Sequence, residues 1–172
     1  MPNTANASAN ANKENNANEL PEVGIKLIKE FEGCHLSAYP DPHTGGLPIT
    51  IGWGSTRKRD GTPFKLGDKI TQKEADELLV EQCKHQYLPT LKKIPYWNIM
   101  NSNQRGALLS FAYNLGANFY EGVNFSTITK RLKYKQWDAM PDTFYLYRNP
   151  GSKLEEGLAR RRKAEGDLWK RD

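Results

Sequence analysis

The sequence predicts an α+β fold, in which a small antiparallel sheet near the N-terminus precedes a larger set of helices. Three observations support this prediction. Residues 49–54 alternate bulky with small side chains, turn-forming Pro and Gly residues flank that segment, and from Thr71 onward apolar residues recur at helical spacing. The chain has 172 residues, which is a normal size for one domain with a buried core.

The N-terminal segment differs from the rest of the chain in composition. Residues 1–19 are rich in Asn and Ala and contain no large apolar side chain after Met1. A segment with nothing to bury cannot offset the entropy that is lost when its backbone is ordered. We therefore expect a flexible tail over residues 1–19 and a single domain over residues 20–172.

The first helix is predicted over Pro21–Glu32. Proline suits the first turn of a helix, and Gly33 suits the position after its last turn. Glu32 should lie on the flank of the core-facing stripe, which the i, i+4, i+8 spacing assigns to Val23, Leu27 and Phe31. A carboxyl group beside apolar surface keeps its proton to higher pH, which suits a general acid.

The predicted sheet is centred on residues 49–54. One face should pack inward because its residues are bulky, namely Ile49, Ile51 and Trp53. The other face leaves room for a ligand beside the backbone, because it carries a hydroxyl and two glycines: Thr50, Gly52 and Gly54. A further strand or turn over Phe64–Ile70 would complete a three-stranded sheet.

The remainder of the chain is predicted to be helical. Thr71 and Glu74 form a capping-box pattern at the start of a run that Pro89 and Pro95 break or bend. Further helices are predicted over residues 103–115, ending before Gly116, and over 126–134, 136–147 and 154–170. Core or inter-lobe packing is expected for three tryptophans: Trp97, Trp137 and Trp169.

Composition restricts the classes of site and partner. The net charge of +5 is compatible with a polyanionic partner, such as nucleic acid, an anionic membrane or bacterial cell wall, and equally with solvated surface lysines. The histidines lack metal-binding spacing, so no metal is expected. Two packed thiols are favoured over one disulfide for Cys34 and Cys83. No apolar run suits a membrane span or a secretory signal, which predicts synthesis in a cytoplasm.

Two acids and a hydroxyl group are expected near the predicted sheet. Glu32 ends the first helix, Asp41 follows nine residues later in a proline-flanked turn, and Thr50 lies in the strand. Cleavage of a glycosidic bond uses two carboxyl groups in different environments, one protonated and one charged. Glu32 fits the acid, Asp41 fits the charged group, and Thr50 could hold a water beside Asp41. Taken alone, such a pair is also typical of two solvated surface charges.

These residues stand in motifs that resemble the phage-type lysozymes, glycoside hydrolase family 24. That family has a Glu at the end of its first helix, an Asp nine residues on and a Thr in a T-x-G-x-G strand. Glu32, Asp41 and Thr50–Gly54 stand at these positions here. The similarity continues through Ser110–Gly116 and Gly157–Glu165, so that it covers almost the whole chain after the tail.

The resemblance implies a lysozyme-like fold, with a sheet lobe and a helical lobe on either side of a cleft. The long helix that joins the lobes should begin near Tyr87 or within Thr71–Lys93. The resemblance also implies a monomer that needs no cofactor. The interval from Asp41 to Thr50 is longer here than in a well-known coliphage member, and the additional length falls in His43–Pro48.

The activity that the resemblance implies is hydrolysis, with inversion, of the β-1,4 bond from N-acetylmuramic acid to N-acetylglucosamine in peptidoglycan. Glu32 would be the general acid, Asp41 would activate the attacking water, and Thr50 would hold that water. An inverting pair of carboxyl groups stands about 6.5–9.5 Å apart. Such an enzyme would lyse the bacterial host of a bacteriophage from within, and would reach the wall in the periplasm after a holin has permeabilised the membrane.

Further residues have two interpretations. Asn114 matches a cleft-lining amide of the family, and a plain helix-terminal hydrogen bond is the alternative. Gly52 and Gly54 would admit sugar rings or would only serve the twist of the hairpin. The cluster Arg160–Arg162 could place one guanidinium near Glu30 or Glu32, and a solvated basic face is the other interpretation.

Two other functions are compatible with parts of this pattern. A lytic transglycosylase needs only the acid and leaves an anhydro-sugar end, so the presence of Asp41 and Thr50 argues against it. A non-catalytic phage component that binds the wall would have lost one of the three residues, all of which are present. Nucleic-acid binding is not expected of an enzyme of this kind. Stable membrane insertion is not expected either, because the apolar stripe of the last helix is narrow.

Overall fold

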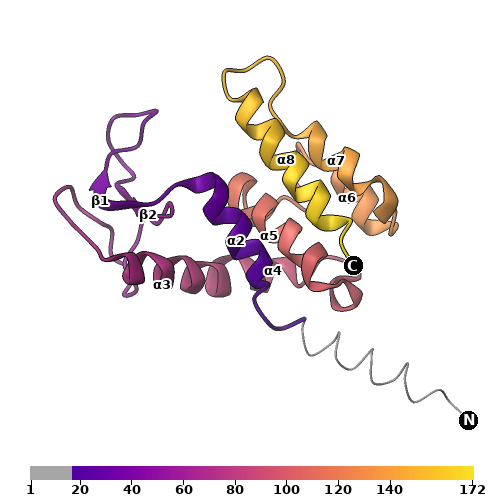
Figure 1. Ribbon diagram of the computed structural model, residues 1–172, viewed down its shortest axis with the longest axis horizontal. Coiled ribbons are helices and arrows are strands. Elements are labelled where there is room, and N and C mark those ends of the chain that lie inside the picture. Colours follow the sequence, from indigo (N-terminus) through magenta and orange to yellow (C-terminus); the bar gives the residue numbers. More distant parts are fainter. Residues whose placement is uncertain (1–16) are drawn as a thin grey trace, which may run out of the picture.

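The structure is a computed structural model that describes residues 17–172. A small sheet lies at one side of the molecule and a group of helices lies at the other, as Figure 1 shows. The predicted tail covers residues 1–19, of which residues 1–16 lie outside the described part of the chain. Ala17 belongs to the packed part, because it is buried and its carbonyl accepts a hydrogen bond of 3.0 Å from the indole of Trp97.

Helix α2 (Glu22–Glu32) begins after Pro21 and ends at Gly33, as predicted. Gly33 has φ of 66°, a conformation that glycine adopts at little cost. The buried face is rotated from the predicted stripe. Ile25, Leu27 and Ile28 are buried, whereas Val23 and Phe31 are half-buried at the edge of the core.

The sheet has two strands, β1 (His35–Tyr39) and β2 (Thr50–Gly52), which pair in antiparallel fashion. The expectation of a third strand over Phe64–Ile70 was wrong. That segment makes a single bridge to β1, between Ser37 and Lys69, because it folds into a turn in which the Asp68 carboxylate accepts the Lys65 N–H. A small apolar cluster beneath the sheet consists of Ile49, Ile51 and Phe64.

A long helical run links the two parts of the molecule and follows the lower edge of Figure 1. It consists of α3 (Gln72–Gln82), a π-helical turn (Cys83–Tyr87) and α4 (Leu88–Leu91), and the predicted capping box of Thr71 is present. Pro89 does not end the run. It stands in the first turn of α4, directly after the widened π turn, where its missing N–H is tolerated.

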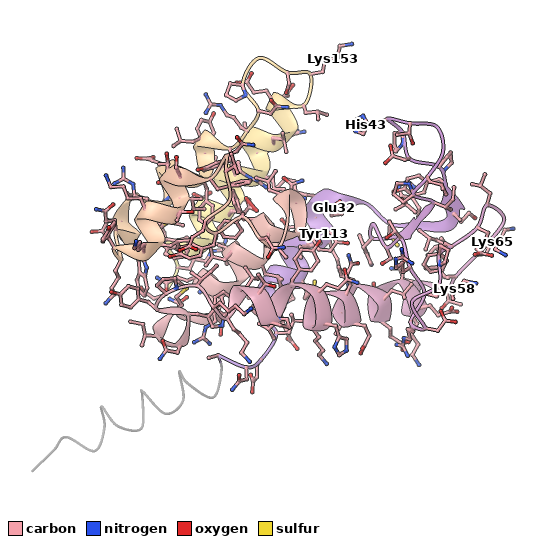
Figure 2. The ribbon with its side chains drawn as sticks, turned by 180° about the vertical axis from the view of Figure 1, so that it is seen from behind. Glu32, His43, Lys58, Lys65, Tyr113 and Lys153 are labelled. Atoms are coloured by element: carbon pink, nitrogen blue, oxygen red, sulfur yellow. The ribbon has the colours of Figure 1, made fainter. Side chains whose placement is uncertain are left out.

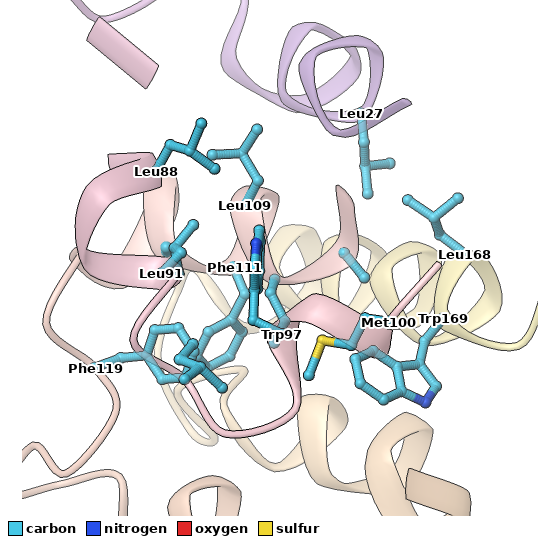
Figure 3. Packing of buried hydrophobic residues seen from close by; sticks show 14 of the residues in the cluster. Leu27, Leu88, Leu91, Trp97, Met100, Leu109, Phe111, Phe119, Leu168 and Trp169 are labelled. Carbon is cyan, nitrogen blue, oxygen red and sulfur yellow. The ribbon is translucent and has the colours of Figure 1, made fainter. Parts of the chain in front are cut away.

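The helical lobe is built around α5 (Ser102–Leu115), whose residues 105–112 are all buried. Around it lie α6 (Ser126–Lys133), α7 (Met140–Leu146), α8 (Glu155–Trp169) and two 3₁₀ turns (Trp97–Ile99 and Trp137–Ala139). Figure 3 shows the apolar core that these helices enclose. Trp97 and Trp169 are buried and Trp137 packs on the core, as predicted.

Within residues 17–172, no helix combines the length and apolarity that crossing a membrane requires. Both thiols are free, as predicted. Cys34 is half-buried and accepts a weak hydrogen bond from Gln72, whereas Cys83 is fully buried.

The two thiols should react at very different rates. Burial raises the pKa of the Cys83 thiol to about 12, and the thiolate is the reactive form. With a thiol-exchange reagent at about pH 8, we expect one fast equivalent from Cys34 and a second only after unfolding. Cys34→Ser is the control that should abolish the fast phase. Two fast equivalents in the native protein would contradict the buried position of Cys83.

Candidate active site

Glu32 is the last residue of α2, and the turn at Gly33 sends the chain from it into β1. Its side chain is 24% exposed, and Oε1 lies 2.7 Å from Nη1 of Arg161 on α8. Oε2 has no hydrogen-bond partner among residues 17–172. Figure 2 shows Glu32 at the base between two projecting loops, whose tips carry His43 and Lys153. One oxygen of Glu32 is therefore anchored and the other is available to a ligand.

The sheet and α5 meet beside Glu32. The hydroxyl of Tyr113 on α5 donates a hydrogen bond of 2.7 Å to the Trp53 carbonyl. A Cβ on Gly54 would lie 3.2 Å from that hydroxyl and 4.0 Å from Oε2 of Glu32, and Gly54 has φ of +108°. Glycine is required at this position both by the backbone conformation and by the close approach.

Asp41 organises the turn that follows β1. Its Oδ1 accepts the N–H groups of His43 at 2.7 Å and Thr44 at 3.2 Å, and its own N–H donates to the Gly46 carbonyl at 3.0 Å. The segment His43–Pro48, which contains the additional length noted in the sequence, is thus a turn held by the carboxylate of Asp41. Oδ2 makes no hydrogen bond within the described part of the chain. As at Glu32, one oxygen is committed to structure and one is free.

Tyr39 lies near both acids and was missed by the sequence analysis. It pairs with Thr50 across the two strands. The pKa of Tyr39 is raised, first by burial and then by the charges of Glu32 and Asp41, so both carboxylates act on the same phenol. The hydroxyl of Thr50 donates to the Pro48 carbonyl at 3.2 Å, which leaves its oxygen lone pairs as acceptors. A tyrosine at the end of a strand has no distinguishing signal in a single sequence.

The three arginines of the cluster Arg160–Arg162 lie in different environments. Arg160 is exposed, while Arg161 and Arg162 are buried. Arg161 contacts Glu32, and it also donates to the Ser110 carbonyl at 3.1 Å. The cluster therefore supplies one guanidinium to Glu32 and none to Glu30, which settles a choice that the sequence left open.

The other buried arginine lies behind the site. Nε of Arg162 is 2.6 Å from Glu165, and its Nη2 donates to Oδ1 of Asn114 at 2.8 Å. Burial raises the pKa of Glu165, and the charges of Arg162 and Arg161 limit that rise. Asn114 thus uses its carbonyl for a structural hydrogen bond, and its amide N–H groups make no hydrogen bond to another described residue.

Three expectations about the site need correction. Gly52 does not face an open surface, because it is buried and a Cβ there would lie 3.4 Å from Ala75 and 3.5 Å from Ile70. Trp53 is half-buried instead of buried, and its indole donates to Asp76 at 2.8 Å. The surroundings of Glu32 are less apolar than expected, since they include the guanidinium of Arg161.

The arrangement contains no evident cation site. No group of three His, Cys, Asp or Glu residues in the described part of the chain is suited to hold a metal ion. What the residues do offer is one carboxyl at a helix end, a second in a turn, a phenol that interacts with both, and a threonine hydroxyl on the strand that pairs with that tyrosine. Such a set can donate a proton at one point and accept one at another.

Comparison with known proteins places this arrangement in a family. A family model described as phage lysozyme matches residues 29–165. The endolysin of Salmonella phage P22 is 36% identical over 147 residues, which cover 84% of this chain and 94% of that protein.

Solved structures that resemble this fold also come from phage endolysins and lysozymes. The endolysin from Escherichia coli O157:H7 phage FAHEc1 has a TM-score of 0.64 at 27% identity, covering 86% of this chain and 90% of that one. A crystal structure of a lysozyme variant of phage P22 has a TM-score of 0.63 at 30% identity, covering 85% and 94% respectively.

Proposed function

The chain belongs to the phage lysozyme family, and on this premise we propose how its residues cleave the substrate. The protein is an endolysin with muramidase activity, which breaks the β-1,4 bond between N-acetylmuramic acid and N-acetylglucosamine in peptidoglycan and so lyses the host cell. The assignment of roles to individual residues, the stereochemistry and the cellular route are our proposals.

Glu32 is the general acid in this proposal. Its proton passes from Oε2 to the glycosidic oxygen while the bond from that oxygen to the anomeric carbon breaks. The guanidinium of Arg161 holds Oε1, which supports a fixed direction for the transfer. Gly54 admits the sugar beside Glu32, because a larger residue would fill the space in front of Oε2.

Asp41 activates the water. Its free Oδ2 takes a proton from a water whose oxygen bonds to the anomeric carbon as the leaving group departs, and the lone pairs of Thr50 orient that water. A single displacement of this kind inverts the anomeric configuration. One observation supports these roles for Glu32 and Asp41. The two acids lie on separate elements, and the charges of both raise the pKa of the same phenol, that of Tyr39. Asn114 would contact the sugar through its amide N–H groups, which have no other partner in the described part of the chain.

The reaction is tested by digesting purified peptidoglycan and analysing the fragments by mass spectrometry and NMR. Hydrolysis with inversion gives reducing muramic-acid ends, whose first-formed anomer is α. Anhydro ends would identify a lytic transglycosylase, and a first-formed β anomer would identify a retaining hydrolase. Absence of any cleavage by correctly folded protein would leave only wall binding.

Membership of the family supports a proposal for the cellular route. We propose that the protein is a monomer made in the bacterial cytoplasm, and that it reaches the wall in the periplasm through a separate membrane-permeabilising holin. Size-exclusion chromatography with light scattering tests the first point. Expression in a bacterium with and without a holin tests the second, and rapid lysis without one would contradict it.

Substitution of Asp41 separates its two roles. Asp41→Asn keeps an Oδ1 acceptor for the turn but removes the charge, so we expect loss of about 100-fold or more in kcat with an unchanged unfolding temperature. Asp60→Asn is the matched control, because Asp60 accepts the Thr62 N–H in a similar turn outside the site. The assay is release of reducing ends. Equal activities of the two variants would exclude Asp41 as the base.

A further inference from the structure

A group of buried polar residues lies directly behind Arg161, where α5 and α8 pack together. Glu165 is at its centre, and its side chain is 0% exposed. A buried carboxyl group is costly unless charges and hydrogen bonds compensate for the lost water. None of the catalytic roles proposed above involves Glu165. Its carboxylate nevertheless contacts Arg161, the residue whose guanidinium holds Glu32.

The carboxylate of Glu165 contacts both buried arginines. Its Oε1 is 2.6 Å from Nε of Arg162, and its Oε2 is 3.8 Å from Nε of Arg161. Arg161 then extends Nη1 to Glu32 at 2.7 Å, and Arg162 extends Nη2 to Asn114 at 2.8 Å. One carboxylate thus lies against two guanidiniums that reach the site at separate points, and its contact with Nε of Arg161 is one of charge without a hydrogen bond.

The charges in this group balance. When both carboxyl groups are ionised, Glu32 and Glu165 carry two negative charges against the two positive charges of Arg161 and Arg162, all on partly or fully buried side chains. Burial raises the pKa of Glu165, and the two guanidiniums oppose that rise by favouring its charged form. Among the other neighbours, α5 contributes Ser110, Asn114 and Tyr113, and burial raises the pKa of the Tyr113 phenol so that it stays uncharged. The phenols of Tyr39 and Tyr87 also face Glu32, and burial raises the pKa of each. On the other side of α8, α7 packs through Pro141 against Gly166, and its ionisable residues, Asp142 and Tyr145, are exposed.

We propose that Glu165 is a positioning residue for the cleavage reaction, which acts on Glu32 through Arg161. It orients the Arg161 guanidinium and cancels one of the two buried positive charges behind Glu32. Without that cancellation, Glu32 would face a net positive charge that favours its ionised form. The proton donor would then be lost at lower pH. This inference rests on the proposed role of Glu32 as general acid.

The test is the pH profile of kcat/KM for the intact protein on purified peptidoglycan. Glu165→Gln should move the alkaline limb to lower pH by roughly one unit, since a unit charge at close range shifts a carboxyl group by about that amount. Glu165→Asp keeps the charge and should leave the limb near its original position. Glu156→Gln, an exposed change on the same helix, is the control and should alter nothing.

A double variant keeps the test decisive if Glu165→Gln folds poorly. Arg162→Met with Glu165→Gln removes one charge of each sign, which buried sites often tolerate. The limb should then return toward the wild-type pH. If both variants only lower activity or unfolding temperature, with the limb unmoved, Glu165 is merely structural. The proposed function fails separately, if the wild type forms no reducing ends or Glu32→Gln remains active.

Discussion

Replacing Glu32 with Gln is expected to lower kcat on purified peptidoglycan by about 100-fold to 10,000-fold, the range that a general acid contributes. Glutamine has the same shape and can still accept a hydrogen bond from Arg161, so the contact at 2.7 Å is not lost through size. What it cannot do is give a proton to the departing oxygen. The measurement is the rate at which reducing muramic-acid ends appear.

The matched control for this prediction is Glu30→Gln. Glu30 lies on the same helix and is exposed, and the structure gives it no contact with Arg161. Its substitution changes the net charge equally and should leave the rate unaltered. Glu30→Gln should unfold at the wild-type temperature, and Glu32→Gln at a lower one, because the buried Arg161 loses its charged partner. Both should be folded at the temperature of the assay. If Glu32→Gln retained the wild-type rate while folding normally, Glu32 would not be the acid.

The parts of the site that could be predicted are those with local signals. Glu32 stands at a helix end marked by Gly33, and Asp41 stands in a turn marked by prolines and glycines, so each could be placed from its neighbours in the sequence. Tyr39 had no such signal, and the cluster Arg160–Arg162 could be recognised without showing which arginine reaches Glu32. Arg161 lies 129 positions from Glu32 along the chain, and only the packing of α8 against α2 and α5 brings the two together.

The errors over residues 52–54 have one physical origin. Alternation of inward and outward residues holds only while the backbone stays extended. Strand β2 is three residues long, and Gly52 at its end has φ of +65°, which turns the chain out of the regular pleat. Gly52 therefore faces α3, and Trp53 is only half-buried beyond it. Over so short a strand, glycine conformation outweighs the hydrophobic pattern.

The position of Glu32 depends on a close crossing of two helices that the sequence did not reveal. Gly24 on α2 meets Gly106 on α5, and a Cβ on Gly24 would lie 2.8 Å from the Gly106 carbonyl oxygen. A glycine inside a helical pattern usually signals weakness, because it costs about 1 kcal/mol relative to alanine. Here the cost is offset by backbones that approach closely enough to fix α2 against the centre of the lobe.

Alanine at either of these glycines should therefore destabilise the protein by about 2 kcal/mol or more, in spite of its higher helix propensity. For Gly24→Ala the clash is with backbone atoms at 2.8 and 2.9 Å, and for Gly106→Ala with the Val23 side chain at 2.7 Å and the Gly24 backbone nitrogen at 2.9 Å. Neither can be relieved by a rotamer change alone, so the helices must separate. Urea unfolding measures the loss.

The control is Gly157→Ala, since Gly157 lies on α8 with no atom within 4 Å of its added Cβ. That change should stabilise by about 0.5 kcal/mol, as propensity acts without a clash. Separation of α2 from α5 would also move Glu32 away from Arg161, so the crossing variants should lose activity even where they remain folded. If all three alanine variants gained stability alike, the crossing would not be tight, and another contact would have to hold Glu32 in place.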